Sequence, residues 1–91
     1  MPERYSIEVR PAALTMLRTL DPPVSRRVLT AIQRLAEDPR PAGVKTLVGS
    51  PGLLRLRVGD YRVVYSVEDG RLLVVVVHLA HRREVYRGGP W

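Results

Sequence analysis

Residues 54–65 of the chain read LRLRVGDYRVVY and predict a β-hairpin. Apolar and polar side chains alternate on both sides of the Gly59-Asp60 pair, as in two antiparallel strands joined by a two-residue turn. In that register Arg57 lies directly opposite Arg62, and Arg55 follows two places along on the same face. Like charges opposite one another destabilise a strand pair by some tenths of a kcal/mol. A face that keeps three arginines is therefore expected to bind an anion; the alternative is an exposed basic face without a ligand.

Residues 53–58, 61–68 and 71–80 predict three strands of an antiparallel meander, with Asp69-Gly70 as its second two-residue turn. The two turns fix a register in which one face of the meander is apolar throughout and is expected to receive helices. That face carries Leu54, Leu56, Val58, Tyr61, Val63, Tyr65, Val67, Leu72, Val74 and Val76. The opposite face carries the arginines at one edge, and then Leu73, Val75, Val77 and Leu79.

The segment before the meander predicts one strand and a helical hairpin. Alternation over residues 5–9 indicates the strand, and apolar residues at helical spacing predict helices over about residues 11–20 and 24–37. Residues 38–51 hold three prolines and two glycines and are expected to form a loop. Because the last strand is apolar on both faces, it is expected to lie inside the sheet, with the first strand on its far side and the strand order 1-4-3-2.

The prediction is one α+β domain over residues 1–91, with the helices packed on one face of the sheet and a basic opposite face. Apolar residues make up 45% of the chain and charged residues 26%, which is typical of a folded globular domain. Fifteen Lys and Arg against nine Asp and Glu give a net charge of +6. This balance favours a nucleic-acid partner or an acidic protein partner.

Arginine provides almost all of the positive charge, because Lys45 is the only lysine among the fifteen basic residues. Arginine suits bidentate contacts with phosphate better than lysine does, although GC-rich coding produces the same bias. The chain has no cysteine, so disulfides and thiolate metal sites are excluded. His78 and His81 are the only imidazoles, and no carboxylate cluster surrounds them. We therefore expect neither a metal centre nor a cofactor.

The longest apolar run, residues 72–77, is far too short to cross a bilayer. The first residues lack the basic-then-apolar pattern of a signal peptide. We expect a cytoplasmic protein that has no membrane partner.

Residues 81–87, HRREVYR, gather the remaining polar groups after the last strand. In the predicted register Arg62 pairs with Val77, and His81 lies on the same face as both. Cleavage of RNA by its own 2′-hydroxyl needs a base, cations that stabilise charge on phosphorus, and an acid for the leaving oxygen. The arginines suit only the second task, because a guanidinium stays protonated. His81 and Glu84 are then the candidate proton acceptors, and Tyr86 could stack on a base.

Each of these residues also has a purely structural interpretation. A histidine at a strand end is often solvated, Glu84 can pair with an arginine, and Tyr86 can pack at the margin of the core. His78 is expected on the helix-facing side, opposite Tyr61, where its role would be structural.

The segments KTLVG at residues 45–49, the hairpin at 54–65 and HRREVY at 81–86, in this order of elements, resemble the RelE toxins of bacterial type II toxin–antitoxin systems, within the RelE/ParE superfamily. The likeness covers about residues 4–87. It implies a RelE-like fold and a metal-independent endoribonuclease that depends on the ribosome, cuts mRNA in the ribosomal A site and so inhibits translation. It also implies a neighbouring antitoxin that neutralises the toxin.

The resemblance also implies roles for individual residues. Arg62 matches the arginine that holds the scissile phosphate, and Arg55 and Arg57 occupy two basic positions that are lysines in the best-known members. Tyr86 matches the tyrosine that stacks on the base beside the cut.

By the same resemblance, the second phosphate-binding arginine is expected to be Arg82 or Arg83, because the segment before the tyrosine varies in length within the family. Lys45 is expected to join the residues that bind the RNA. Since arginine replaces lysine at two positions, proton transfer is expected to pass to His81 or Glu84, or the ribosome supplies geometry that the protein lacks.

Two alternatives use the same scaffold. One is a ParE-like relative that inhibits DNA gyrase by contact and cuts nothing, and the other is a non-catalytic member that binds RNA or only its antitoxin. In each case an acidic antitoxin of the RelB or Phd type is expected to cover the helices and the basic face. Contact with operator DNA is expected only through the antitoxin.

Overall fold

The computed structural model describes residues 4–47 and 49–81 of the chain. Its α+β architecture and the order of its elements confirm the predicted class. The elements are β1 (Ser6–Val9), α1 (Pro11–Thr19), α2 (Pro22–Arg34), β2 (Lys45–Thr46), β3 (Leu54–Val58), β4 (Tyr61–Glu68), the 3-10 turn η1 (Asp69–Arg71) and β5 (Leu73–His81). None of the helices in these two ranges is long and apolar enough to cross a membrane.

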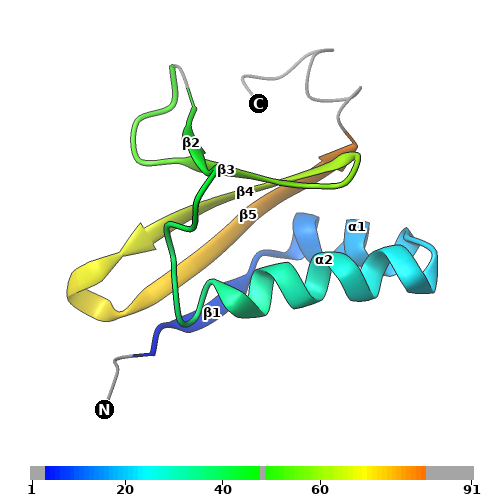
Figure 1. Cartoon of the computed structure of the whole chain (residues 1–91), viewed down its shortest axis with the longest axis horizontal. Helices are drawn as coiled ribbons and strands as arrows, with labels where there is room; N and C mark the ends of the chain where they lie inside the picture. Colours follow the sequence, from blue (N-terminus) through cyan, green and yellow to red (C-terminus); the bar gives the residue numbers. More distant parts are fainter. Residues whose placement is uncertain (1–3, 48, 82–91) are drawn as a thin grey trace.

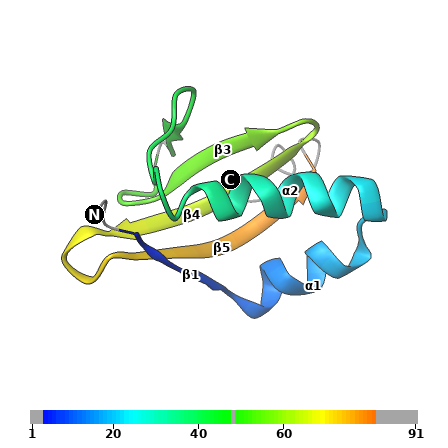
Figure 2. The same ribbon diagram turned by 60° about the horizontal axis from the view of Figure 1, so that its bottom comes forward.

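The strands form one sheet with the order β1-β5-β4-β3-β2. β1 runs parallel to β5, while the other neighbours are antiparallel. The expected position of the first strand beside the last is therefore confirmed (Figure 2). The two-residue strand β2 was missed, because two residues inside a proline-rich loop are too few to show alternation.

Both helices lie on one side of the sheet, as expected (Figure 1). Prolines occupy the first turn of each helix, where the missing N–H costs no hydrogen bond. Helical spacing then places one apolar stripe of α1 and one of α2 against the sheet. The buried core consists of Ala13, Leu17, Val28, Ile32, Leu35, Val63, Tyr65, Val74, Val76 and Leu79.

The β3–β4 hairpin has the predicted register. Val58 pairs with Tyr61 and Arg57 with Arg62, on either side of the Gly59-Asp60 turn. Gly59 has a φ of +60°, which a type II′ turn requires at its first central position and which glycine adopts without steric cost. The side chain of Arg62 consequently points away from the helices, because its neighbours along β4 belong to the core cluster.

The β4–β5 connection differs from the prediction in two respects. The turn is longer, because Glu68 pairs with Leu73 and residues 69–72 form the connection, with Leu72 in the left-handed region at a φ of +48°. A β-bulge then follows: Tyr65 pairs with Val76 but Val64 pairs with His78, so Val77 is an extra residue. Beyond the bulge the faces of β5 are exchanged relative to the prediction.

This bulge corrects three assignments. Leu79, expected on the basic face, is 2% exposed and belongs to the helix-side core. Arg62 pairs with Ala80 rather than with Val77, and His81 pairs with Tyr61. His81 therefore lies on the opposite face from Arg62, while His78 shares the face of Arg62.

Asp69 in the β4–β5 turn accepts hydrogen bonds from two distant segments, the one before β1 and the loop after α2. Its Oδ1 accepts a hydrogen bond from the Tyr5 hydroxyl at 2.6 Å. Arg40 donates to both carboxylate oxygens, at 3.1 and 2.9 Å. This arrangement fixes the Asp69 carboxylate within the four-residue connection of residues 69–72. The loop after α2 is thereby tied to the end of the sheet.

Asp69→Asn is expected to destabilise the domain near neutral pH and to reduce its sensitivity to acid. Hydrogen bonds from Arg40 and then Tyr5 lower the pKa of Asp69 from 3.8 to about 2. Between these values the unfolded chain binds a proton that the folded chain does not, so stability falls as the pH falls through this window. Thermal melts measure the effect: the difference in Tm between the two proteins should narrow from about pH 4 downward.

Glu68→Gln removes a neighbouring surface carboxylate that pairs with Arg71 instead, and it serves as the charge-matched control. A Tm difference for Asp69→Asn that stays constant from neutral to acidic pH would contradict the assignment.

Candidate anion-binding site

Four basic side chains gather on the sheet face opposite the helices. A cavity of about 300 Å³ is lined by Gly43, Lys45, Arg55, Arg57 and Arg62. These are four of the residues that the sequence singled out for anion binding, brought together from three strands. No acidic residue lines the cavity within the described part of the chain.

The backbone pairing forces these charges together. Lys45 pairs with Arg55 across β2 and β3, and Arg57 pairs with Arg62 across β3 and β4. Each is a like-charge pair at direct cross-strand distance, which is unfavourable in the absence of an anion. The hairpin sequence predicted one like-charge pair, and the structure has two of them side by side. The second pair strengthens the indication of an anion site.

Arg62 is the most deeply placed of the four. The residue is 8% exposed, and its Nη1 atom is buried. A buried guanidinium close to other cations is costly unless negative charge or hydrogen bonds compensate it. Arg57, in contrast, is exposed, and its Nε donates to the Gly59 carbonyl at 3.2 Å. The cavity thus has one cation at its base and another held at the rim by the hairpin turn.

Two contacts near its start hold the loop that carries Gly43 and Lys45 to the cavity. The Tyr65 hydroxyl donates to the Pro39 carbonyl at 2.6 Å, and Arg40 next to it binds Asp69. Burial raises the pKa of Tyr65 to about 12, so the phenol stays a neutral donor at physiological pH. These contacts set the path of the loop before β2 pairs with β3.

The two histidines lie on opposite faces of β5. His78 pairs with Val64, which itself pairs with Arg55, so these three residues form one row on the basic face. His81 contacts the Tyr61 ring edge-on, with the ring centroids 5.3 Å apart, on the other face. The expectation that His81 shares a face with Arg62, and that His78 does not, is wrong. A bulge inside the run of four valines at residues 74–77 leaves no trace in the hydrophobic pattern.

Arg82, Arg83, Glu84 and Tyr86 lie outside the described residues. Within residues 4–47 and 49–81, no three His, Asp or Glu side chains gather into a group that could hold a metal ion. The described site can bind and neutralise an oxyanion through guanidinium and ammonium groups. A proton acceptor must come from a side chain other than the arginines.

The comparisons with known proteins agree with this architecture. Residues 7–86 match the family described as the ParE toxin of the type II toxin–antitoxin system parDE. A toxin RelE of Mycobacterium tuberculosis is 49% identical over 39 residues, which span 43% of this chain and 40% of that toxin. A putative toxin RelE1 of Methanocaldococcus jannaschii is 25% identical over 87 residues, covering 92% of this chain and 97% of that protein.

Among solved structures, the archaeal RelE–RelB complex from Pyrococcus horikoshii contains a similar chain. The TM-score is 0.78 at 29% sequence identity, with 93% of this chain and 99% of that chain covered. The family match spans residues 7–86, and the structural match covers 93% of the chain. The chain therefore belongs to the ParE toxin family of type II toxin–antitoxin systems, within the RelE/ParE superfamily, and has the fold of the RelE toxins.

Proposed function

We propose that this toxin is a ribosome-dependent mRNA endoribonuclease that cuts mRNA in the ribosomal A site and so inhibits translation. The observation that carries the proposal is the cavity formed by Lys45, Arg55, Arg57 and Arg62. Its four cations suit a phosphodiester of an extended single strand. We further propose that the protein acts in the cytoplasm, where mRNA is translated.

The proposed chemistry is attack of the ribose 2′-oxygen on the adjacent phosphorus. Negative charge grows on the phosphoryl oxygens as the bond forms, and Arg62 at the base of the cavity would stabilise it together with Arg55 and Arg57. Lys45 would hold the RNA strand at the rim. Arg82 or Arg83 is proposed as the second phosphate-binding arginine, and Tyr86 as the stacking residue. The reaction as proposed needs no metal.

Proton transfer is proposed to use a histidine. His81 is the histidine that the sequence indicated as a proton acceptor, and His78 is the one that shares the sheet face of Arg62. Because a proton acceptor must reach the same phosphodiester as the arginines, the shared face supports His78. Glu84 stays a candidate from the sequence.

We also propose that an acidic antitoxin of the RelB or Phd type neutralises the toxin. The net charge of +6 and the basic sheet face favour an acidic protein partner. The similar RelE chain from Pyrococcus horikoshii was solved as a complex with RelB. Any contact with operator DNA is proposed to run through the antitoxin.

Cleavage of a defined mRNA, mapped by primer extension with and without programmed ribosomes, tests the proposed function. Cuts at the A-site codon that require ribosomes are expected, because the protein alone offers few groups for proton transfer. Cuts in naked RNA at the same rate would contradict the ribosome dependence, and no cuts in either reaction would contradict the nuclease.

Arg62→Ala is expected to lower the cleavage rate by about 10²-fold or more, because it removes the cation at the base of the cavity. Arg57→Ala, at an exposed position, should cause a smaller loss without any risk to the core. Arg71→Ala, in the β4–β5 turn, removes the same charge far from the cavity and should leave the rate unchanged. Circular dichroism melts establish that the variants are folded, and a folded Arg62→Ala with the wild-type rate would refute the phosphate site.

His78→Gln is expected to slow cleavage by about tenfold or more, whereas His81→Gln is expected to have a smaller effect. The two histidines lie three residues apart on the same strand and on opposite faces, so each variant is a matched control for the other. Single-turnover rates on programmed ribosomes, measured across neutral pH, give the comparison. A larger loss in His81→Gln would return the proton-transfer role to that residue.

Inhibition of DNA gyrase is a second candidate function, favoured by the ParE family match over residues 7–86. It requires contact with a protein and does not require an aligned phosphate site. A supercoiling assay with purified gyrase separates the two functions, since only a gyrase inhibitor would block the supercoiling of DNA. A chain inactive in both assays would be a non-catalytic binder of RNA or antitoxin.

A further inference from the structure

The proposed reaction needs a proton donor for the oxygen that leaves, and the anion cavity contains one side chain suited to this task. The residues that line the cavity are Gly43, Lys45, Arg55, Arg57 and Arg62. A guanidinium keeps its proton, whereas the ammonium group of a lysine carries a proton at neutral pH and can release it. Lys45 is also the only lysine of the chain. Among the lining residues that the structure describes, Lys45 is therefore the one that can act as an acid.

Lys45 lies at one end of a row of residues that crosses four strands. Lys45 of β2 pairs with Arg55 of β3, and Arg55 pairs with Val64 of β4. Val64 in turn pairs with His78 of β5. Residues paired directly across antiparallel strands share one face of the sheet. Neighbouring strands are about 4.8 Å apart, so the backbones at the two ends of the row are separated by about 14 Å.

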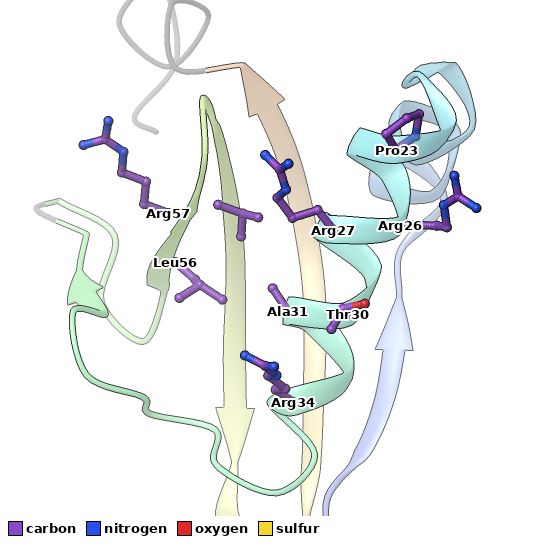
Figure 3. A pocket seen from close by; sticks show the side chains of 9 residues that line it. Pro23, Arg26, Arg27, Thr30, Ala31, Arg34, Leu56 and Arg57 are labelled. Carbon is purple, nitrogen blue, oxygen red and sulfur yellow. The ribbon is translucent and has the colours of Figure 1, made fainter.

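The other two arginines of the cavity form the next row on the same face. Arg57 pairs with Arg62 across β3 and β4, and it lies two residues along β3 from Arg55. Figure 3 looks into a groove of about 550 Å³ between α2 and β3, on the helix side of the sheet, and shows that Arg57 extends from β3 away from α2. A phosphate held by Arg55 and Arg62 on this face lies between the strand of Lys45 and the strand of His78.

The surroundings of Lys45 suit a proton donor. The residue is exposed, and none of the ion pairs within residues 4–47 and 49–81 involves its ammonium group. Its backbone is held by the pairing of β2 with β3, and the Tyr65 hydroxyl holds the loop that precedes it at the Pro39 carbonyl. The ammonium group is thus accessible to a ligand, while the strand that carries it has a defined place beside Arg55.

We propose that Lys45 is the general acid of the reaction and protonates the 5′-oxygen as it leaves. This inference rests on the proposed function, and it adds a catalytic role to the RNA contact proposed there for Lys45. In an in-line displacement the attacking and leaving oxygens lie on opposite sides of phosphorus, so the base and the acid must approach from opposite sides. The two ends of the row, Lys45 and His78, meet this requirement.

The proton balance of the step is complete with these two side chains. The 2′-oxygen forms a bond to phosphorus, and its proton passes to the imidazole of His78. The bond between phosphorus and the 5′-oxygen breaks, and Nζ of Lys45 gives that oxygen a proton. The products are a 2′,3′-cyclic phosphate and a 5′-hydroxyl group. Exchange with water then removes the proton from the imidazolium and returns one to the amine.

Two substrates that differ only in the leaving atom test the role of Lys45. One mRNA on programmed ribosomes carries the natural 5′-oxygen at the scissile position, and the other carries sulfur in its place. A thiolate leaves without protonation, so only the oxygen substrate needs an acid. Lys45→Met is expected to lower the single-turnover rate on the oxygen substrate by about 10²-fold, and this loss should shrink to about threefold or less on the sulfur substrate.

Two further variants are matched controls. Lys45→Arg keeps the positive charge but cannot release a proton, so its rate on the oxygen substrate should stay at least about tenfold below that of the wild type. Arg57→Met removes another exposed cation from the same cavity. Its loss should be the same on both substrates, because Arg57 is proposed to stabilise charge on the phosphoryl oxygens. Circular dichroism melts establish that all three variants are folded.

The possible failures point to different conclusions. Equal losses for Lys45→Met on the two substrates would overturn the acid role and leave the nuclease intact. A wild-type rate for Lys45→Arg on the oxygen substrate would do the same, because Lys45 would then act through its charge alone. Absence of cleavage of both substrates by the wild-type chain would refute the proposed function, and this inference with it.

Discussion

The pairing of β3 with β4 in a single register is the constraint on which the rest of the structure depends. Side chains alternate along a strand with a period of two, so a slip of one residue between β3 and β4 would turn either Arg57 or Arg62 toward the helices. The Gly59 turn and the apolar residues of the helix side exclude that slip together. The register therefore buries Val63 and Tyr65 in the core and, by the same alternation, collects the arginines on the other face. Core packing and the anion cavity are two consequences of one arrangement.

Two surfaces of the protein carry exposed positive charge, and the two arise for different reasons. On the basic face, like charges are paired across β2, β3 and β4, and the structure keeps them in place through backbone hydrogen bonds. On the helix side, α2 does not cover β3 completely. The apolar side chains of Leu56 and Val58 therefore line a groove together with Arg27 and Arg34 of α2. The first surface suits a phosphodiester, where charge is the main requirement.

The contacts around Asp69 connect the fold to the cavity. Tyr5 near the start of β1, Arg40 in the loop after α2 and the β4–β5 turn meet at one exposed carboxylate. The hydrogen bond from Tyr65 to the Pro39 carbonyl holds the same loop at a neighbouring point. Since this loop continues into β2, the position of Lys45 beside Arg55 is set by residues that do not themselves line the cavity. Contacts at the β4–β5 end of the sheet thus help to position a residue that lines the cavity.

The sequence by itself determined the α+β class, the order of the elements, the strand order and the β3–β4 register, because each follows from local periodicity and turn chemistry. It also identified Arg55, Arg57 and Arg62 as one basic cluster, since a two-residue turn fixes which residues face each other. Tertiary structure alone decided the bulge at Val77, which exchanged the faces of His78 and His81, because four consecutive valines satisfy either register equally well. It also decided the pairing of β2, the capture of Asp69 by Arg40 and Tyr5, and the groove between α2 and β3, since each depends on how segments distant in sequence meet in space.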